Sequence, residues 1–385
     1  MVPVQTFEMT TKVIFGIESL RELPTIGRTL GKKVLVVTGK TALIDNGVLH
    51  RVETLLNGAG FQMTAFSEVE PEPSLDTVRK GLALGRSIQA DWVIGLGGGS
   101  AMDVAKAIAG LFGGENELEF YFDGGKIMQP GIPLVTIPTT SGSGAEVTHF
   151  AVLSDRVRKI KRPIEGNSFA ACIAVIDPQL SMSTPDQVTI YSGLDALTQG
   201  IEAFTSKDST ALSDIYAFSA VERISNNLLN VYHDGQDIKA RTEMTLGSLE
   251  SGIALRNAGM GAVHGLAHPI GIRTGKPHGL VCAVLLLPVM RFNLSACYEK
   301  YARITKAMGL NTVGGSDTID VAALSMKHIL SLERKLGIPT HISGLGITEA
   351  ELPQIVAEAL TTPAMKSNPR EATADDLLNI LRENF

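Results

Sequence analysis

The first half of the chain alternates short apolar runs with helical patterns, and this alternation constrains the fold more than any other feature. Apolar runs at Lys33–Thr38, Asp91–Leu96 and Ile132–Ile137 are each followed directly by glycine or proline. Buried parallel strands have this composition, and strand–helix alternation is typical of a doubly wound sheet. We therefore predict an α/β domain with a doubly wound parallel sheet over residues 1–184.

The pattern changes after Asp177-Pro178, where helical periodicity replaces the alternation. In the first half, further strands are predicted at 61–66, 150–153 and 172–176, and helices at 47–58, 74–87 (with Ser74 as its cap) and 102–112. In the second half, helices are predicted at 194–206, 213–229, 240–256, 298–307, 318–336 and 349–360. We place the boundary near Thr184-Pro185 and predict an all-α domain over residues 185–385.

The composition narrows the class of protein. A formal net charge of −6 argues against nucleic-acid binding, and 44% hydrophobic residues exclude a disordered chain. The apolar run Gly279–Met290 is shorter than the roughly 20 residues that span a bilayer, so we predict a buried core segment and no membrane association. Three cysteines without a CxxC pairing favour a reducing compartment and predict no thiolate zinc site. With no signal peptide visible at the N-terminus, we expect a cytoplasmic protein.

Glycine accounts for 39 of 385 residues, and three glycines stand together in Gly97-Gly98-Gly99-Ser100. A glycine-rich strand end that opens a helix exposes backbone N–H groups and suits a pyrophosphate, although the sequence is not GxGxxG. A tight strand–helix turn is the alternative. Asp103 and Lys106, one helical turn apart, could face a cofactor or form a surface ion pair. The hydroxyl-rich run Thr139–Gly144 ends another strand at the same predicted sheet edge, where ligands bind.

Three of the eight histidines, His264, His268 and His278, lie within fifteen positions in an otherwise apolar segment. His264 and His268 are four residues apart and share a helix face. A zinc peptidase would have Glu at position 265, where this chain has Gly. A satisfied core histidine is the ordinary alternative, but the clustering favours a metal or catalytic site, with Asp195 as the carboxylate partner.

At these residues the sequence resembles the iron-dependent (group III) alcohol dehydrogenase family. The resemblance spans nearly the whole chain, in a series of motifs that keep one order. They are Phe15-Gly16, Gly97–Lys106, Pro138–Thr148, Gly193–Thr198, Val263–Pro269, Pro277–Gly279 and Asn368–Arg370. The resemblance implies an N-terminal dinucleotide-binding domain, a helical metal-binding domain and an active site in the cleft between them.

The family motifs also imply individual roles. Asp195, His264 and His278 would be metal ligands, and His268 would lie near the nicotinamide and take part in proton transfer. The cofactor would be held by Gly39, Gly97, Gly98, Gly99, Ser100, Asp103, Lys106, Thr139, Thr140, Ser143 and Thr148.

Two positions depart from the family pattern. Gln199 stands where typical members have a fourth ligand, His, and an amide oxygen is a weaker donor than imidazole. We retain Gln199 as a candidate ligand, expect Fe²⁺ with Zn²⁺ as the alternative, and predict weakened metal retention. Gly39 stands where NAD-restricted members often have Asp, so we predict that both NAD and NADP are accepted.

The resemblance therefore predicts an alcohol dehydrogenase or aldehyde reductase that transfers hydride between a nicotinamide and a small alcohol or aldehyde. We expect a homodimer or larger homo-oligomer. One alternative on the same fold is a dehydroquinate-synthase-type lyase, which needs Lys and Arg around its site for a phosphorylated substrate. A metal-independent reductase and a catalytically inactive binding module are two others.

Overall fold

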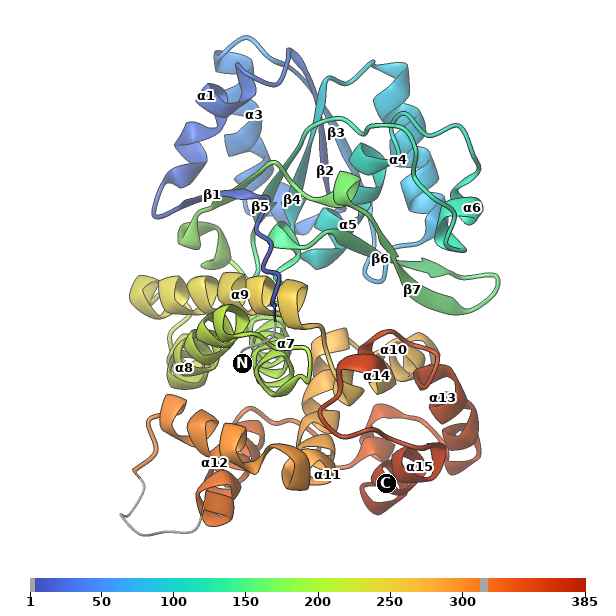
Figure 1. Ribbon diagram of the computed structural model, residues 1–385. Helices are drawn as coiled ribbons and strands as arrows, with labels where there is room; N and C mark the ends of the chain where they lie inside the picture. The colour runs from blue at the N-terminus through green and yellow to red at the C-terminus, as the bar shows by residue number, and fades with distance from the viewer. Residues whose placement is uncertain (1–3, 312–317) are drawn as a thin grey trace. The chain divides into compact units, whose positions relative to one another are not determined.

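The computed structural model describes residues 4–311 and 318–385, which form two compact units (Figure 1). The first, called here the sheet unit, contains residues 9–140 and 144–184. The second, the helical unit, contains residues 4–8, 141–143 and the described part of 185–385. Each unit has its own buried apolar core.

Six parallel strands form the main sheet in the order β1-β8-β5-β4-β2-β3. They are β1 (Lys12–Phe15), β2 (Lys33–Gly39), β3 (Gln62–Val69), β4 (Trp92–Gly97), β5 (Leu134–Pro138) and β8 (Ile173–Ile176). The predicted parallel α/β fold is confirmed. Because β5, β4 and β2 are neighbours and run the same way, their carboxyl ends share one edge of the sheet.

Helices cover both faces of this sheet (Figure 1). They are α1 (Leu23–Gly27), α2 (Ala42–Asp45), α3 (Val48–Gly58), α4 (Leu75–Ser87), α5 (Gly99–Gly110) and α6 (Leu118–Phe122), with short 3₁₀ turns at Ser19–Glu22, Ala145–Val147, Asn167–Phe169 and Pro178–Ser181. Alternate residues of β2 face the two cores: Val34 and Val36 pack with α1 and α3, and Leu35 and Val37 pack with α4 and α5. Ser74 caps α4, as predicted.

One predicted strand lies outside the main sheet. β6 (Phe150–Asp155) pairs antiparallel with β7 (Ile160–Glu165), which the sequence reading missed. The missed strand carries Lys161 and Arg162, so it is not apolar throughout. Its charged residues masked the strand pattern. They are tolerated because only one face of the strand is covered and because Lys161 forms an ion pair with Glu72.

The helical unit contains the remaining helices. They are α7 (Asp186–Thr205), α8 (Ala211–His233), α9 (Ile238–Ala258), α10 (Ala262–Thr274), α11 (His278–Ala307), α12 (Thr318–Lys335), α13 (Leu352–Ala359), α14 (Ala364–Ser367) and α15 (Ala374–Glu383), with 3₁₀ turns at Ile342–Leu345 and Glu349–Glu351. The predicted start at residue 194 was wrong: α7 begins eight residues earlier, so Asp195 lies in mid-helix. The helix predicted at 298–307 is the last part of α11, after a kink at Cys297.

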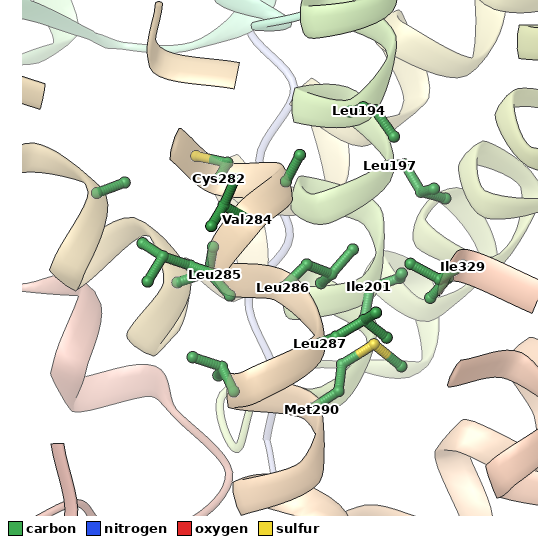
Figure 2. Close-up of a cluster of buried hydrophobic side chains, with 14 of the residues drawn as sticks. Leu194, Leu197, Ile201, Cys282, Val284, Leu285, Leu286, Leu287, Met290 and Ile329 are labelled. Atoms are coloured by element: carbon green, nitrogen blue, oxygen red, sulfur yellow. The ribbon is translucent and has the colours of Figure 1, made fainter. Parts of the chain in front are cut away.

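The apolar run 279–290 forms the first part of α11 and is buried, as predicted. By length and composition α11 could cross a membrane, but 72% of its most apolar window is buried inside the unit, as in a core helix. Figure 2 shows Leu286 and Leu287 of α11 beside Ile201 of α7. α11 therefore forms the centre of the helical core.

Candidate active site

Three helices bring four potential metal-binding side chains together in the helical unit. Asp195 comes from α7, His264 from α10, and His278 and Cys282 from α11. One donor atom from each lies within 4.8 Å of the others. The Nε2 atoms of both histidines are 3.7 Å from the same carboxylate oxygen, Asp195 Oδ1. The three predicted ligands are thus neighbours, although Asp195 precedes His264 by 69 positions in the chain. We call Asp195, His264, His278 and Cys282 the metal cluster.

A glycine allows α11 to approach α7 at this point. A Cβ atom on Gly279 would lie 2.0 Å from the backbone oxygen of Tyr191 and 3.2 Å from Cβ of Asp195. Any side chain at this position would therefore force the first turn of α11 away from α7. The glycine that follows His278 is a packing requirement of the metal cluster.

Three buried polar side chains of α7 lie on one face of the helix. Asp195, Gln199 and Glu202 follow the i, i+4, i+7 spacing and are all buried. Glu202 Oε2 lies 2.5 Å from His264 Nδ1, and Glu202 Oε1 accepts a hydrogen bond from the Val263 amide at 2.7 Å. A carboxylate at Nδ1 orients the ring with Nε2 toward Asp195, as in carboxylate–histidine–metal arrangements. Sequence reasoning missed Glu202, although its spacing was visible.

Gln199 interacts with Asp195 through its amide nitrogen. Its Nε2 donates to Asp195 Oδ2 at 3.2 Å, and its Oε1 accepts from the Ser251 hydroxyl at 3.0 Å. In this arrangement the amide orients the carboxylate, and the amide oxygen already has a hydrogen-bonding partner. Gln199 as a metal ligand stays a prediction.

The metal cluster combines buried donor atoms that could hold a cation. Asp195 Oδ1 and His264 Nε2 are buried, and neither has a hydrogen-bond partner in the described part of the chain. Burial raises the pKa of Asp195, but the neighbouring His278 and His264 outweigh it and hold the pKa below its usual range. Burial raises the pKa of the Cys282 thiol to about 12. An oxygen, two imidazole nitrogens and a sulfur are donors that fit a divalent transition metal.

His268 lies on α10, one turn after His264, and is half-buried. Its ring centroid is 5.5 Å from that of His278. The predicted catalytic histidine is therefore beside the metal cluster and is not a member of it.

Asn368, in the motif Asn368–Arg370, contacts the start of α10. The sequence had given this motif no individual role. The Asn368 side chain accepts a hydrogen bond from the Ala262 amide at 3.1 Å and exchanges two more with the Asn293 side chain, at 2.8 and 3.0 Å. Asn368 is buried. It satisfies the first turn of α10, which carries His264.

In the sheet unit, the glycine triplet forms the start of α5. Gly98 is the N-cap and α5 begins at Gly99, three residues before the predicted start at residue 102. Among the described residues, no side chain caps this first turn. The Ala101 and Met102 amides donate to the Gly98 oxygen, so the Gly99 and Ser100 amides are the candidate donors to a ligand. Gly97 has φ +143°, which favours glycine. A Cβ on Gly98 would lie 3.2 Å from Thr140 Oγ1, so the two predicted cofactor segments are adjacent.

The sheet order places Gly39 and Thr139 at the same edge. Gly39 ends β2, Gly97 ends β4, and the Thr139 amide, just beyond β5, donates to the Gly97 oxygen at 3.0 Å. A Cβ on Gly39 would meet only the Val69 oxygen, at 3.8 Å, so a side chain fits there. Ser100 lies in the first turn of α5, whereas Ser143 belongs to the helical unit.

Asp103 and Lys106 do not form a surface ion pair. The Lys106 side chain is fully buried, and its Nζ lies 3.6 Å from Asp103 Oδ1. The same Nζ donates to Thr148 Oγ1 at 2.6 Å and to the Phe150 backbone oxygen at 2.9 Å. Asp103 accepts from the Val152 amide, and burial raises its pKa to about 6. These contacts attach β6 to α5. A cofactor role for Asp103, Lys106 and Thr148 stays a prediction.

Comparison with known proteins agrees with this description. The model of the "Iron-containing alcohol dehydrogenase" family matches residues 10–178, and that of the "Fe-containing alcohol dehydrogenase family, C-terminal" matches residues 189–385. The 1,3-propanediol dehydrogenase of Citrobacter freundii is 37% identical over 92% of both chains. The NAD-dependent methanol dehydrogenase of Bacillus methanolicus is 30% identical over 96% of this chain and 97% of its own. A solved structure of a 1,3-propanediol oxidoreductase covers 100% of both chains at 34% identity, with a TM-score of 0.95.

The chain belongs to the iron-containing alcohol dehydrogenase family. It is thus an oxidoreductase of the alcohol dehydrogenase class, with relatives that use NAD. The resemblance drawn from the sequence motifs is confirmed, and so is the predicted class of enzyme. The dehydroquinate-synthase-type alternative gives way to this assignment.

Proposed function

We propose that the protein is a metal-dependent alcohol dehydrogenase or aldehyde reductase that uses NAD or NADP and acts on small alcohols or aldehydes. The observation that carries this proposal is the pair of buried atoms without hydrogen-bond partners, Asp195 Oδ1 and His264 Nε2, in a cluster of oxygen, nitrogen and sulfur donors. Leaving such atoms unsatisfied is costly unless a cation completes the site. We further propose that the enzyme works in the cytoplasm as a homodimer or larger homo-oligomer.

When bound, a divalent metal supplies a Lewis acid for the substrate oxygen, and a nicotinamide exchanges a hydride with the substrate carbon. Asp195, His264 and His278 would hold the metal. Glu202 would keep the Nε2 atom of His264 aimed at the metal cluster, because its carboxylate lies against Nδ1. His268, half-buried beside His278, would exchange a proton with the substrate oxygen or with solvent.

The sheet unit would bind the dinucleotide along the shared edge of β5, β4 and β2. The uncapped first turn of α5 would receive the pyrophosphate at Gly97–Ser100, where backbone amides and the helix dipole favour an anion. Thr139 and Thr140 would line the neighbouring strand end. Gly39 leaves room at the end of β2 for a ribose with or without a 2′-phosphate, and the exposed Lys40 follows it.

The proposal is tested by measuring consumption of NADH and of NADPH with a panel of small aldehydes. Each assay is repeated with added Fe²⁺, with added Zn²⁺ and with a chelator. We expect reduced cofactor to be consumed with both nicotinamides, metal to restore activity, and chelator to abolish it. Activity that persists in the fully metal-free protein would favour a metal-independent reductase. No consumption of either cofactor by the metal-loaded protein would leave a binding module.

A further inference from the structure

We propose that Cys282 is the fourth protein ligand of the metal centre, in the place left by the amide at position 199. This inference rests on the proposed metal-dependent function and deepens it. It assigns the centre one carboxylate oxygen, two imidazole nitrogens and one thiolate sulfur, from Asp195, His264, His278 and Cys282.

The separation of Cys282 from its neighbour fits a shared metal. Cys282 follows His278 by one turn of α11, so both side chains lie on the same helix face. Sγ is 3.5 Å from His278 Nε2, a separation at which the thiol and the imidazole form a hydrogen bond when no metal is bound. Bonds of about 2.3 Å to sulfur and about 2.0–2.1 Å to nitrogen at a tetrahedral angle place those two atoms about 3.5 Å apart. The 3.7 Å separations between the histidine nitrogens and Asp195 Oδ1 are a few tenths of an ångström longer than the about 3.4 Å that nitrogen and oxygen ligands have at a tetrahedral angle.

Two further donors converge on the same place. Asp195 Oδ1 and His264 Nε2 are buried without hydrogen-bond partners in the described residues, and their side chains belong to the set that lies within 4.8 Å of the Cys282 sulfur. The amide oxygen of Gln199, in contrast, already accepts a hydrogen bond from Ser251. The sulfur is therefore better placed than the amide to complete a four-ligand set.

A small core residue is the ordinary role for a buried cysteine, and Cys282 does border the apolar core. Figure 2 shows its sulfur at the end of the labelled cluster that lies away from Met290. Cys297, the other buried cysteine, shows that ordinary role: its Sγ donates to the Asn293 oxygen at 3.1 Å, four residues back on α11. Cys282 differs because its sulfur meets imidazole and carboxylate groups.

A thiolate ligand changes which metal the centre prefers. Thiolate is a soft donor that suits Zn²⁺ better than a set made only of oxygen and imidazole donors does. We therefore expect this centre to retain Zn²⁺ against exchange with Fe²⁺, and to lose metal when the thiol is oxidised.

Substitution of Co²⁺ provides a test that does not depend on activity. The metal-free full-length protein is loaded with Co²⁺ alone, and its absorption spectrum is recorded for the wild type, Cys282→Ser, Cys297→Ser and the double variant Cys172→Ser/Cys297→Ser. We expect the near-ultraviolet thiolate-to-cobalt band in every form that retains Cys282, including the double variant, whose only thiol is Cys282. Cys282→Ser should lose the band and bind Co²⁺ more weakly, by at least the roughly 10–100-fold that loss of a residue supporting a metal ligand costs.

Each outcome decides between the two proposals. If the wild type binds Co²⁺ but shows no thiolate band, Cys282 is a core residue and not a ligand, and the proposed metal-dependent function stands. If the folded wild type binds no Co²⁺, both proposals fail. The double variant keeps the test decisive if Cys282→Ser does not fold, because the presence or absence of the band in it reports on Cys282 alone.

Discussion

The two units of this protein build their candidate sites from different materials. In the sheet unit, the candidate site consists mainly of backbone: the uncapped first turn of α5 and the neighbouring strand ends. In the helical unit, it consists of side chains from α7, α10 and α11 that are far apart in the chain. A backbone site is encoded locally and depends on small residues, whereas a side-chain site depends on how helices pack.

Removing the charge of the metal cluster should have the largest effect. Asp195→Asn removes the carboxylate that both histidine nitrogens face, so we expect loss of bound metal and a fall in kcat/KM of roughly 10³-fold. Elemental analysis and aldehyde reduction measure both. Asp186→Asn, at the exposed start of the same helix, is the matched control and should change neither. Full metal content in Asp195→Asn would remove this residue from the ligand set.

Packing of α11 against α7 can be broken without touching a ligand. Gly279→Ala places a methyl group on the Tyr191 oxygen, so we expect a loss of about 1–3 kcal/mol or more in the free energy of unfolding, together with loss of metal. Gly271→Ala, in α10, meets no atom within 4 Å and should be neutral or stabilising by up to about 1 kcal/mol. Denaturant titration and metal content compare the two. Equal stability of both variants would show that the close approach is not required.

The backbone-built site should respond to an added charge rather than to lost packing. Gly39→Asp fits, since only the Val69 oxygen lies near the new Cβ, and its carboxylate would repel a 2′-phosphate. We expect the ratio of kcat/KM for NADPH to that for NADH to fall about tenfold or more, with stability unchanged. Gly39→Asn is the uncharged control. An unchanged ratio would mean that the end of β2 does not contact the ribose.

Each unit also buries a carboxyl group whose pKa burial raises, to about 7 for Glu146 in the sheet unit and to about 8 for Glu333 in the helical unit. Between the unfolded-state pKa and the higher folded-state pKa, the native protein keeps a proton on this carboxyl group that the unfolded chain has lost. Glu333 therefore lowers the free energy of unfolding progressively as the pH rises from about 4.5 to about 8.

Glu333→Gln keeps the neutral shape and should remove that part of the fall. We expect its Tm to match the wild type near pH 5 and to exceed it by a few degrees at pH 9. Thermal melts across this range, with the exposed Glu349→Gln as control, measure the difference. A constant difference in Tm at all pH values would contradict the assignment.

Much of the sheet unit could be predicted because its signals are local. The runs at 33–38, 91–96 and 132–137 correspond to β2, β4 and β5, since a strand buried on both faces is apolar throughout. β7 was missed because a two-stranded ribbon carries charged residues on its open face. The start of α7 was also missed, although Pro185 followed by Asp186 is a recognisable helix start.

The cluster in the helical unit was only partly predictable. His264, His278 and Asp195 were found through their grouping and through the family motifs. Cysteine spacing led us to expect no thiolate zinc site, because only cysteine pairs were considered. Cys282 stands four residues after His278, and that mixed pair was the available signal.

The sequence by itself determined the strand–helix alternation of the sheet unit, the family, the glycine-rich helix start and the residue types that could hold a metal. These properties follow from periodicity, chain neighbours and motif order, which need no knowledge of packing. Only the tertiary structure decided that Glu202 faces His264, that Gln199 orients Asp195, and that the sulfur of Cys282 joins the cluster. The reason is geometric: these contacts depend on the rotation and approach of three helices, to within a few ångströms, and no local pattern specifies that.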